Sequence, residues 1–326
     1  MADGGPHAPQ GSVSELGEFE LIAAVIARMP ATVDVLLGPG DDAAVVAAAD
    51  GQVVATTDAL VEGVHFKRAW SSGVDVGHKA AAANLADVAA MGARPTALLV
   101  ALALPADLPA PWALGLADGL AGEAAAAGAG VAGGDVVRAD VLVVAVTALG
   151  SLDGRPPVRR GGARPGDVLA VCGVLGFSAG GLAVLSRGFT APRALVAAHR
   201  RPTPPYAAGP QAAAAGATAM IDVSDGLLAD LAHVATASGV AVDVDTATLE
   251  VDEVLASAAS ALGLDAREWQ LTGGEDHALV ATFPPGTALP PGWRRLGSVA
   301  EGSGVSVDGV SYAGPGGYRH FGGPTR

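Results

Sequence analysis

The sequence is poor in cysteine, aromatic residues and positive charge. Its 326 residues include one cysteine, Cys172, so no disulfide framework can stabilise the chain. Cys172 lies inside the apolar run 168–174, which predicts a core residue and not a nucleophile. Aromatic residues make up 4% of the chain while half of it is apolar, so the cores are predicted to consist mainly of small aliphatic side chains.

The shortage of positive charge excludes whole classes of partner. A formal net charge of −14 argues against nucleic acid and against anionic membranes. Phosphate ligands stay possible, because bound cations can reverse a local acidic field. Polar residues interrupt the most apolar region, so no membrane span is predicted. Residues 1–14 lack a basic-then-apolar pattern and are interpreted as a disordered tail, which fits a cytoplasmic protein.

The length and the order of elements predict two domains. A segment rich in Arg, Gly and Pro spans residues 153–166, so the boundary is placed near Gly150. Strands and helices alternate on both sides of it, and the hairpin signals Asp50-Gly51 and Asp308-Gly309 imply some antiparallel pairing. We therefore expect two mixed α/β domains, 15–150 and 151–326, and not one doubly wound sheet.

The first domain contains the strongest periodic segments. Helices are predicted over 15–29, 74–91 and 110–127, the last two rich in alanine. The apolar strands 96–104 and 141–149 alternate poorly, which is typical of strands covered on both faces.

A short acidic segment at the end of a strand is the most informative stretch of the second domain. The apolar run 218–221 leads into Asp222, Ser224 and Asp225, and an amphipathic helix follows Gly226. Ser224 is predicted to be the N-cap, with Asp225 in the first turn, where the helix dipole favours an anion. The pattern fits a magnesium or phosphate corner, or simply a capped helix with solvated acids.

Similar acidic positions recur at the ends of other elements. Hydroxyl residues accompany them, and together these oxygens would bind hard cations; the Cys/His set expected for zinc is missing. Magnesium ions beside glycine loops are what a nucleoside triphosphate requires, although each acid could also cap a turn independently. A glycine-rich helix start at 173–181 resembles a phosphate loop but lacks a Walker A or dinucleotide spacing. The acids are Asp42, Asp58, Asp87, Asp135 and Asp222; the hydroxyl residues are Thr56, Thr57 and Ser224.

Seven segments and the C-terminal stretch together resemble the bacterial thiamine-monophosphate kinase family, within the superfamily that includes aminoimidazole ribonucleotide synthetase. The resemblance runs from about residue 15 to the C-terminus, and segments 84–93 and 222–226 are the most specific to the superfamily. The matching segments are Gly40-Asp41-Asp42, Thr56-Thr57-Asp58 with His65, Asn84 to Ala93, Gly133-Gly134-Asp135, Arg160 with Gly166-Asp167, Ile221 to Gly226, Gly273-Gly274-Glu275-Asp276, and Tyr318 with His320 and Phe321.

This resemblance implies a PurM-like fold, a homodimer in which the N-terminal domains share a barrel, and a site in the cleft that the C-terminal domain completes. It also implies direct, Mg²⁺-dependent transfer of the γ-phosphoryl group of ATP to thiamine monophosphate. The implied Mg²⁺ positions are Asp42, Thr56, Thr57, Asp58, Asp87, Asp135, Asp222 and Asp225; the nucleotide positions are Gly134, Asp135, Arg160 and Ser224; the substrate positions are His65, Glu275 and Tyr318.

Other interpretations stay open at this point. The three substrate positions could be a solvated imidazole, a turn acid and an anchor for the C-terminal tail. The chain could be another ATP-using member of the superfamily, such as an aminoimidazole ribonucleotide synthetase-like enzyme, or a regulator that binds nucleotide or thiamine phosphate without turnover. Selenophosphate synthetase fits less well, because its chemistry needs a Cys or selenocysteine near the N-terminus and Cys172 is in mid-chain.

Overall fold

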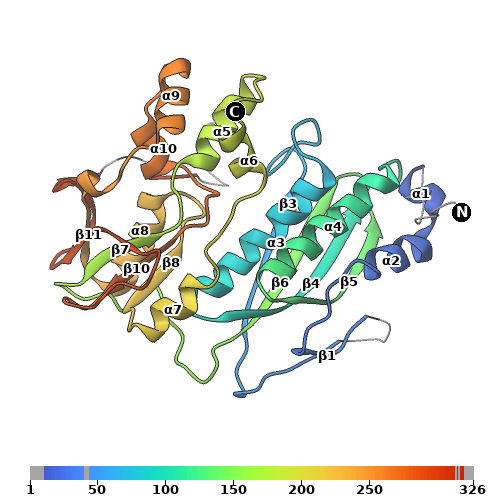
Figure 1. Ribbon diagram of the computed structural model, residues 1–326, viewed down its shortest axis with the longest axis horizontal. Helices are drawn as coiled ribbons and strands as arrows, with labels where there is room; N and C mark the ends of the chain where they lie inside the picture. Colours follow the sequence, from blue (N-terminus) through green and yellow to red (C-terminus); the bar gives the residue numbers. More distant parts are fainter. Residues whose placement is uncertain (1–10, 40–43, 313, 315, 319–326) are drawn as a thin grey trace, which may run out of the picture. The chain divides into compact units, whose positions relative to one another are not determined.

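A computed structural model of the chain describes residues 11–39, 44–312, 314 and 316–318. The chain divides into two compact units, and Figure 1 shows the elements of each in sequence colours. Unit 1 contains Met1–Ala48, Ala55–Asn84 and Pro95–Leu149, and unit 2 contains Ala49–Val54, Leu85–Arg94 and Gly150–Arg326. The boundary divides the long helix over residues 73–90: residues 73–84 belong to unit 1, and residues 85–90 belong to unit 2.

Unit 1 is built on a four-stranded sheet with the strand order β3-β6-β4-β5. Strands β4 and β5 run parallel, in register from Ala97↔Gly130 to Leu104↔Arg138. A separate antiparallel pair joins β1 and β2. The elements, in chain order, are α1 (Val13–Leu16), α2 (Glu18–Ile26), β1 (Val35–Leu37), β2 (Val45–Val46), β3 (Val54–Val61), α3 (Gly73–Ala90), β4 (Arg94–Leu104), α4 (Ala110–Ala126), β5 (Gly130–Arg138) and β6 (Val143–Ser151).

The sheet of unit 1 has one covered face in the single chain. In β4, Leu98, Val100 and Leu102 are buried, whereas Leu99 and the alternate residues between them are exposed. Because successive side chains of a strand point to opposite faces, this pattern means that one face carries the core. The poor alternation of the sequence arises because the exposed positions of β4 are apolar as well. The isolated chain covers one face, and the expectation that both faces are covered stays a prediction for an assembly of two chains.

The N-terminal helix differs from the single helix predicted over 15–29. Ser12 caps α1 in a capping box with Glu15, so residues 11–14 of the expected tail have a defined local structure. Gly17 then adopts φ 87° and separates α1 from α2, which ends at Ile26. Such a φ is available to glycine at little cost and breaks the helical path.

Helices α3 and α4 pack with their backbones in direct contact. A Cβ atom on Gly73 would lie 2.0 Å from the carbonyl oxygen of Trp112, and one on Gly77 would lie 2.0 Å from that of Leu116. A Cβ atom on Gly119 would lie 2.1 Å from the carbonyl oxygen of Val74. Only glycine allows this approach, and the buried alanines of both helices fill the space around it.

Unit 2 contains a seven-stranded sheet with the order β13-β12-β9-β11-β7-β10-β8. Strands β12 and β9 are parallel, and the other neighbouring pairs are antiparallel. The elements are β7 (Val168–Cys172), α5 (Phe177–Ser186), α6 (Arg193–Arg200), α7 (Ala208–Ala214), β8 (Ala219–Asp222), α8 (Leu227–Ser238), β9 (Ala241–Val244), the 3-10 helix η1 (Thr246–Thr248), α9 (Glu253–Leu262), α10 (Ala266–Thr272), β10 (Leu279–Phe283), β11 (Arg294–Ala300), β12 (Gly304–Val307) and β13 (Val310–Ser311).

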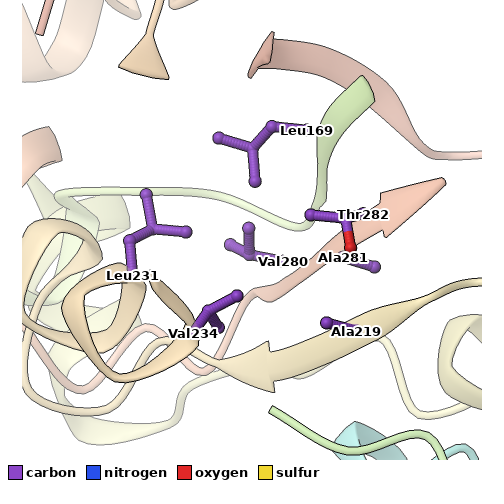
Figure 2. A pocket seen from close by; sticks show the side chains of 7 residues that line it. All are labelled: Leu169, Ala219, Leu231, Val234, Val280, Ala281 and Thr282. Carbon is purple, nitrogen blue, oxygen red and sulfur yellow. The ribbon is translucent and has the colours of Figure 1, made fainter. Parts of the chain in front are cut away.

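The central strands of unit 2 are covered on both faces. Along β10, Val280 packs with α8 on one face, and Leu279 and Phe283 pack with α7 and Trp293 on the other. Cys172 is buried in this second core, as predicted. Figure 2 shows the side chains around a narrow gap in the first core, and because the gap has no room for a water molecule it is a packing feature and not a ligand site; the lining residues are Leu169, Ala219, Leu231, Val234, Val280, Ala281 and Thr282.

The mixed sheets confirm the predicted fold class. Asp308-Gly309 forms the tight turn of the β12–β13 hairpin, with φ 52° and 76°. Gly133-Gly134-Asp135, expected at the end of an element, lies instead inside strand β5. A Cβ atom on Gly134 would lie 1.9 Å from the carbonyl oxygen of Val100, so the glycine serves close strand approach. Within the described residues, no helix is both long and apolar enough to cross a membrane.

The close approach of α3 and α4 yields a matched pair of substitutions on α4. Gly119→Ala should lower the free energy of unfolding by about 1–3 kcal/mol, because the new methyl group overlaps the backbone of α3. Gly122→Ala meets nothing within 4 Å and should raise it by about 0.5–1 kcal/mol through the better helix propensity of alanine. Urea denaturation of both variants measures the difference, and equal effects would contradict the packing argument.

Candidate functional site

The acidic segment after β8 is folded around a carboxylate that the sequence interpretation did not consider. Oδ2 of Asp230, in the first turn of α8, accepts the backbone N–H groups of Ser224, Asp225 and Gly226 at 3.0, 3.2 and 3.1 Å. The N-cap is Gly226, with φ 139°, so the prediction that Ser224 is the N-cap is wrong. The reason is that Asp230 reaches back one turn and satisfies the amides that an N-cap side chain would otherwise serve.

The pKa of Asp230 is affected by burial and by the negative charges nearby. Burial, followed by the charges of Asp222 and Asp225, raises its pKa to about 7, although the amides of Gly226 and Asp225 act in the opposite direction. Asp222, at the end of β8, is itself buried. A cation bound beside these carboxylates would lower the energy of their ionised forms.

A second corner, formed by residues 273–277, lies directly beside the first. Glu275 donates its N–H to the carbonyl oxygen of Ser224 at 2.8 Å, and His277 donates its own to that of Val223 at 2.9 Å. Both Glu275 and His277 have positive φ, 65° and 54°. A Cβ atom on Gly274 would lie 2.3 Å from the carbonyl oxygen of Ser224, so glycine is required there. Strained backbone of this kind persists only where its surroundings hold it.

His277 joins the two corners through its side chain. Its Nδ1 donates to Oδ2 of Asp222 at 3.0 Å, and both groups are buried. Burial disfavours the imidazolium, but the hydrogen bond and charge of Asp222, with the charges of Glu275 and Asp87, raise the pKa of His277 overall. Asp87, on the last turns of α3, therefore acts electrostatically on the same group of residues.

The C-terminal segment is attached to the first corner by its backbone. Tyr318 donates its N–H to the carbonyl oxygen of Asp225 at 2.9 Å, and Ala229 donates to that of Gly316 at 3.2 Å. The side chain of Tyr318 is half exposed. Unit 2 thus gathers most of the site residues that the sequence assigned to the second domain, together with Asp87, which the sequence assigned to the first. The residues of the second domain are Asp222, Ser224, Asp225, Glu275 and Tyr318.

Arg160 is separate from this group. It lies in the loop between β6 and β7, exposed, and its carbonyl oxygen accepts the hydroxyl of Ser238 at the far end of α8. The same hydroxyl accepts the N–H groups of Gly162 and Ala163, which fixes the loop on α8.

The metal-binding positions assigned to unit 1 lie on strands at opposite edges of its sheet. Thr56, Thr57 and Asp58 are consecutive on β3, so Thr57 faces the other way from its two neighbours. The hydroxyl of Thr57 donates to the carbonyl oxygen of Val146 on β6 at 3.0 Å, and the N–H of Asp58 donates to Oδ1 of Asn84 at 2.9 Å. Asp135 is on β5, and its carboxylate accepts a hydrogen bond from the N–H of Val136. Asp42 lies outside the described residues.

His65 follows β3 and has a defined tautomer. Its Nδ1 accepts the N–H of Val61 at 3.0 Å, so the ring is neutral with its proton on Nε2. Its carbonyl oxygen accepts Nζ of Lys79 at 3.3 Å. The loop is therefore shaped by its own contacts, and the imidazole presents a donor at Nε2.

The glycine-rich start of α5 is occupied by the protein itself. Asp276 accepts the N–H of Gly176 through Oδ2 at 2.5 Å and that of Ser178 through Oδ1 at 2.8 Å. The carboxylate thus takes the place that a phosphate would take in a phosphate-binding loop, and the resemblance noted at 173–181 has a structural explanation. Burial raises the pKa of Asp276 to about 7, against the effect of these two amides.

Asp230, Asp276 and His277 went unrecognised in the sequence as parts of the site. A signal exists for Asp230, because it lies four residues after Gly226, where a first-turn carboxylate can face the preceding loop. The partners of Asp276 and His277 are between 55 and 100 residues away, beyond any local pattern.

Two domain-family models match the chain and define its class. Residues 40–152 match the N-terminal domain of AIR synthase related proteins, and residues 164–281 match the C-terminal domain. The chain is also 52% identical over 317 residues to a thiamine-monophosphate kinase of Mycobacterium tuberculosis, covering 96% of this chain and 94% of that protein.

Solved structures agree with this classification. A thiamine-monophosphate kinase from Stenotrophomonas maltophilia superposes with a TM-score of 0.80 at 37% identity, covering 94% of this chain and all of that one. AaThiL in complex with AMPPCP and TMP superposes with a TM-score of 0.79 at 34% identity, covering 95% and 98%. This chain therefore belongs to the thiamine-monophosphate kinase family.

The buried carboxylate of Asp276 predicts a pH dependence of stability. Its pKa is about 7 in the folded protein against the ordinary value of 3.8 for an aspartate, so the folded state binds the proton more tightly. The stability that Asp276 contributes should then be fully present below pH 4 and be lost as the pH rises through about 7, by up to roughly 4 kcal/mol. Asp276→Asn cannot ionise and should make this fall shallower in denaturant titrations at several pH values, while the part that comes from Asp230, whose pKa is also about 7, stays in place.

Asp308→Asn provides the control for that experiment. Hydrogen bonds from Thr246 lower the pKa of Asp308, so this exposed carboxylate should leave the fall between pH 4 and 7 in place. An unchanged slope in Asp276→Asn would show that Asp276 is not its source.

Proposed function

We propose that this chain phosphorylates thiamine monophosphate, transferring the γ-phosphoryl group of ATP directly to the substrate phosphate to give thiamine diphosphate and ADP. The main support is that nearly the whole chain matches a thiamine-monophosphate kinase at 52% identity. The fold likeness to AaThiL in complex with AMPPCP and TMP supports it, because AMPPCP is an ATP analogue. The alternative is a regulator that binds nucleotide or thiamine phosphate without turnover. An assay for release of ADP distinguishes the two.

Residues of the second corner and the C-terminal segment are proposed to bind the acceptor. Glu275 offers a carboxylate for the aminopyrimidine or the cationic ring of the substrate, and Tyr318 offers a half-exposed aromatic face for stacking. Support comes from the backbone bonds that fix both beside residues 224 and 225. His65 in unit 1 is proposed to contribute the N–H at its Nε2.

Mg²⁺ and the nucleotide are proposed to use the remaining positions. Within the described ranges, no three His, Cys, Asp or Glu side chains come together in a metal-binding cluster. This fits Mg²⁺, which takes one or two carboxylates and completes its shell with water and substrate phosphates. Burial raises the pKa of Asp230 most, and the negative charges of Asp222 and Asp225 raise it further, so a cation beside them would be stabilised. The proposed Mg²⁺ ligands are Asp42, Thr56, Thr57, Asp58, Asp87, Asp135, Asp222 and Asp225, with Gly134, Asp135, Arg160 and Ser224 at the nucleotide.

Bound Mg²⁺ would neutralise charge on the phosphates, and the protein's own residues would do the rest. Phosphoryl transfer depends mainly on positioning and electrostatic stabilisation and needs no covalent intermediate. The paired corners supply that positioning, because Asp230 and Gly274 fix the backbone from which Ser224 and Asp225 project. Arg160 is proposed to contact the phosphates because of the family resemblance, although its backbone lies beside the far end of α8.

The test is Mg²⁺-dependent release of ADP in the presence of thiamine monophosphate. Asp87→Asn should reduce kcat by at least about 100-fold with little change in unfolding, because a half-buried metal ligand is lost. Tyr318→Ala should raise KM for thiamine monophosphate by roughly 5- to 100-fold, the range for loss of ring stacking, and leave KM for ATP within about twofold.

Asp118→Asn, on the exposed side of α4, is the control and should behave like the parent protein. Binding of both ligands without ADP release would support the regulator. Labelled γ-phosphate on a side chain during turnover would contradict direct transfer.

We also propose that the chain forms a homodimer through unit 1, whose sheet has an exposed apolar face. Leu99 on β4 and Val137 on β5 are 37% and 50% exposed in the single chain, and Ala103, on the same face of β4, pairs with Val137. Such a face is stabilised when a second copy covers it.

We also propose the cytoplasmic location that the sequence predicts.

Light scattering at micromolar concentration should give twice the mass of one chain. Leu99→Glu together with Val137→Glu should shift the protein toward monomers, because it places charge on the face that a partner would cover. Val310→Glu, at a 71% exposed position on β13 of unit 2, is the control and should leave the mass unchanged. A parent protein that is monomeric and fully active would reject the proposal.

A further inference from the structure

A buried histidine lies behind the carboxylate of Glu275. Nδ1 of His199, on α6, lies 3.4 Å from Oε2 of Glu275 and 3.1 Å from the hydroxyl oxygen of Ser178 on α5. The side chain of His199 is 6% exposed and that of Glu275 is 33% exposed. The carboxylate therefore has a buried polar contact on one side while part of it reaches solvent.

The packing of α5 against α6 fixes where this imidazole lies. A Cβ atom on Gly181 would lie 2.1 Å from the carbonyl oxygen of Leu195 and 2.7 Å from Cβ of His199. The missing side chain at Gly181 lets α6 come close enough for His199 to reach Ser178, which lies three residues earlier on the same face of α5. The backbone N–H of Ser178 is in turn held by Asp276. The ring is thus positioned from two helices and from the second corner.

The chemistry of the two neighbours favours a proton on Nδ1. An ionised carboxylate can only accept hydrogen bonds, so an unprotonated Nδ1 would face the lone pairs of Glu275. With hydrogen on Nδ1, the ring can donate toward Glu275 and toward the Ser178 hydroxyl oxygen. A contact between a proton on Nδ1 and an ionised carboxylate is stronger than one between neutral groups, and the histidine side of this contact is buried.

The backbone of Glu275 fixes where its side chain starts. Its φ of 65° and the N–H bond to the carbonyl oxygen of Ser224 set the direction in which Cβ leaves the chain. The bonds beyond Cβ can still rotate, so the carboxylate is oriented by the groups that it contacts. Nδ1 of His199 is such a contact, on the buried side of the carboxylate.

The geometry points to His199 as a positioning residue that orients the Glu275 carboxylate toward the acceptor substrate. It acts through Glu275 and touches neither substrate. The inference rests on the proposed function, because it takes Glu275 to be the contact for thiamine monophosphate. It assigns acceptor affinity partly to a pair of helices, α5 and α6, that carry none of the proposed site residues.

The test compares three histidine variants by steady-state kinetics. His199→Leu, which removes the donor, should raise KM for thiamine monophosphate about tenfold, as expected when one charge-assisted contact is lost. Its kcat and its KM for ATP should stay within about twofold, because the interaction is the same in the ground and transition states. His199→Asn places an amide N–H near the position of Nδ1 and should restore most of the affinity. His233→Leu, on the exposed face of α8, should match the parent protein.

A double-mutant cycle with Glu275→Gln separates positioning from general support of the fold. If His199 acts through Glu275, His199→Leu should add little to the KM of the Glu275→Gln protein. An equal effect in both backgrounds, or equal losses for both substrates, would overturn the inference. An unchanged KM in His199→Leu alongside a fully active parent would overturn it without touching the proposed function.

A parent protein that binds but does not turn over thiamine monophosphate would refute the proposed function, and the inference with it. If His199→Leu does not fold, the parent protein labelled with ¹⁵N-histidine gives the answer. The ring resonance absent from His199→Asn should move on addition of thiamine monophosphate and not on addition of ATP alone. A ring resonance that does not move on addition of thiamine monophosphate would overturn the inference.

Discussion

The buried carboxylate of Asp230 is the interaction on which the site of unit 2 depends. One oxygen atom accepts three successive backbone N–H groups and holds residues 224–226 in a single conformation. That conformation exposes the carbonyl oxygens of Val223 and Ser224, which accept the amides of His277 and Glu275 from the second corner. It also presents the carbonyl oxygen of Asp225 to Tyr318. Without this carboxylate, three separate segments would lose their common template.

This arrangement concentrates acid groups where a solvated protein would separate them. Burial and like charges raise the pKa of Asp230 to about 7, and burial does the same for Asp276. His277 offsets part of the charge by its bond to Asp222. Stability that is lost in this way is commonly found at functional sites, where a ligand restores it on binding. For a family that binds ATP, cations are the natural ligands to do so.

Glycines set the distances between elements in both units. In unit 1 they let α3 and α4 meet backbone to backbone, and at Gly134 they let β5 approach β4. In unit 2, Gly181 brings α6 against α5, and Gly274 brings the second corner against the first. The acidic residues of the sequence are conspicuous, but the contacts that aim them depend on these positions without side chains.

The sequence by itself determined the class of fold, the long alanine-rich helices α3 and α4, the burial of Cys172, the Asp308-Gly309 hairpin and the segments that mark the family. Local propensity and periodicity are sufficient for such features, because neighbouring residues specify them. The sequence likewise identified segments 222–226 and 273–276 as candidates for metal or ligand binding, but it did not show that they are neighbours in space.

Only the tertiary structure decided which groups meet. Asp276 caps α5 from 98 to 100 residues away, and His277 reaches Asp222 across 55. Gly226 begins α8 in place of Ser224, because Asp230 satisfies the amides from within the helix. Gly133-Gly134-Asp135 lies within a strand where the end of an element was expected, because pairing with β4 outweighs the turn preference of glycine. Hydrogen bonds and close approaches between distant segments form only on folding, and a local pattern does not contain them.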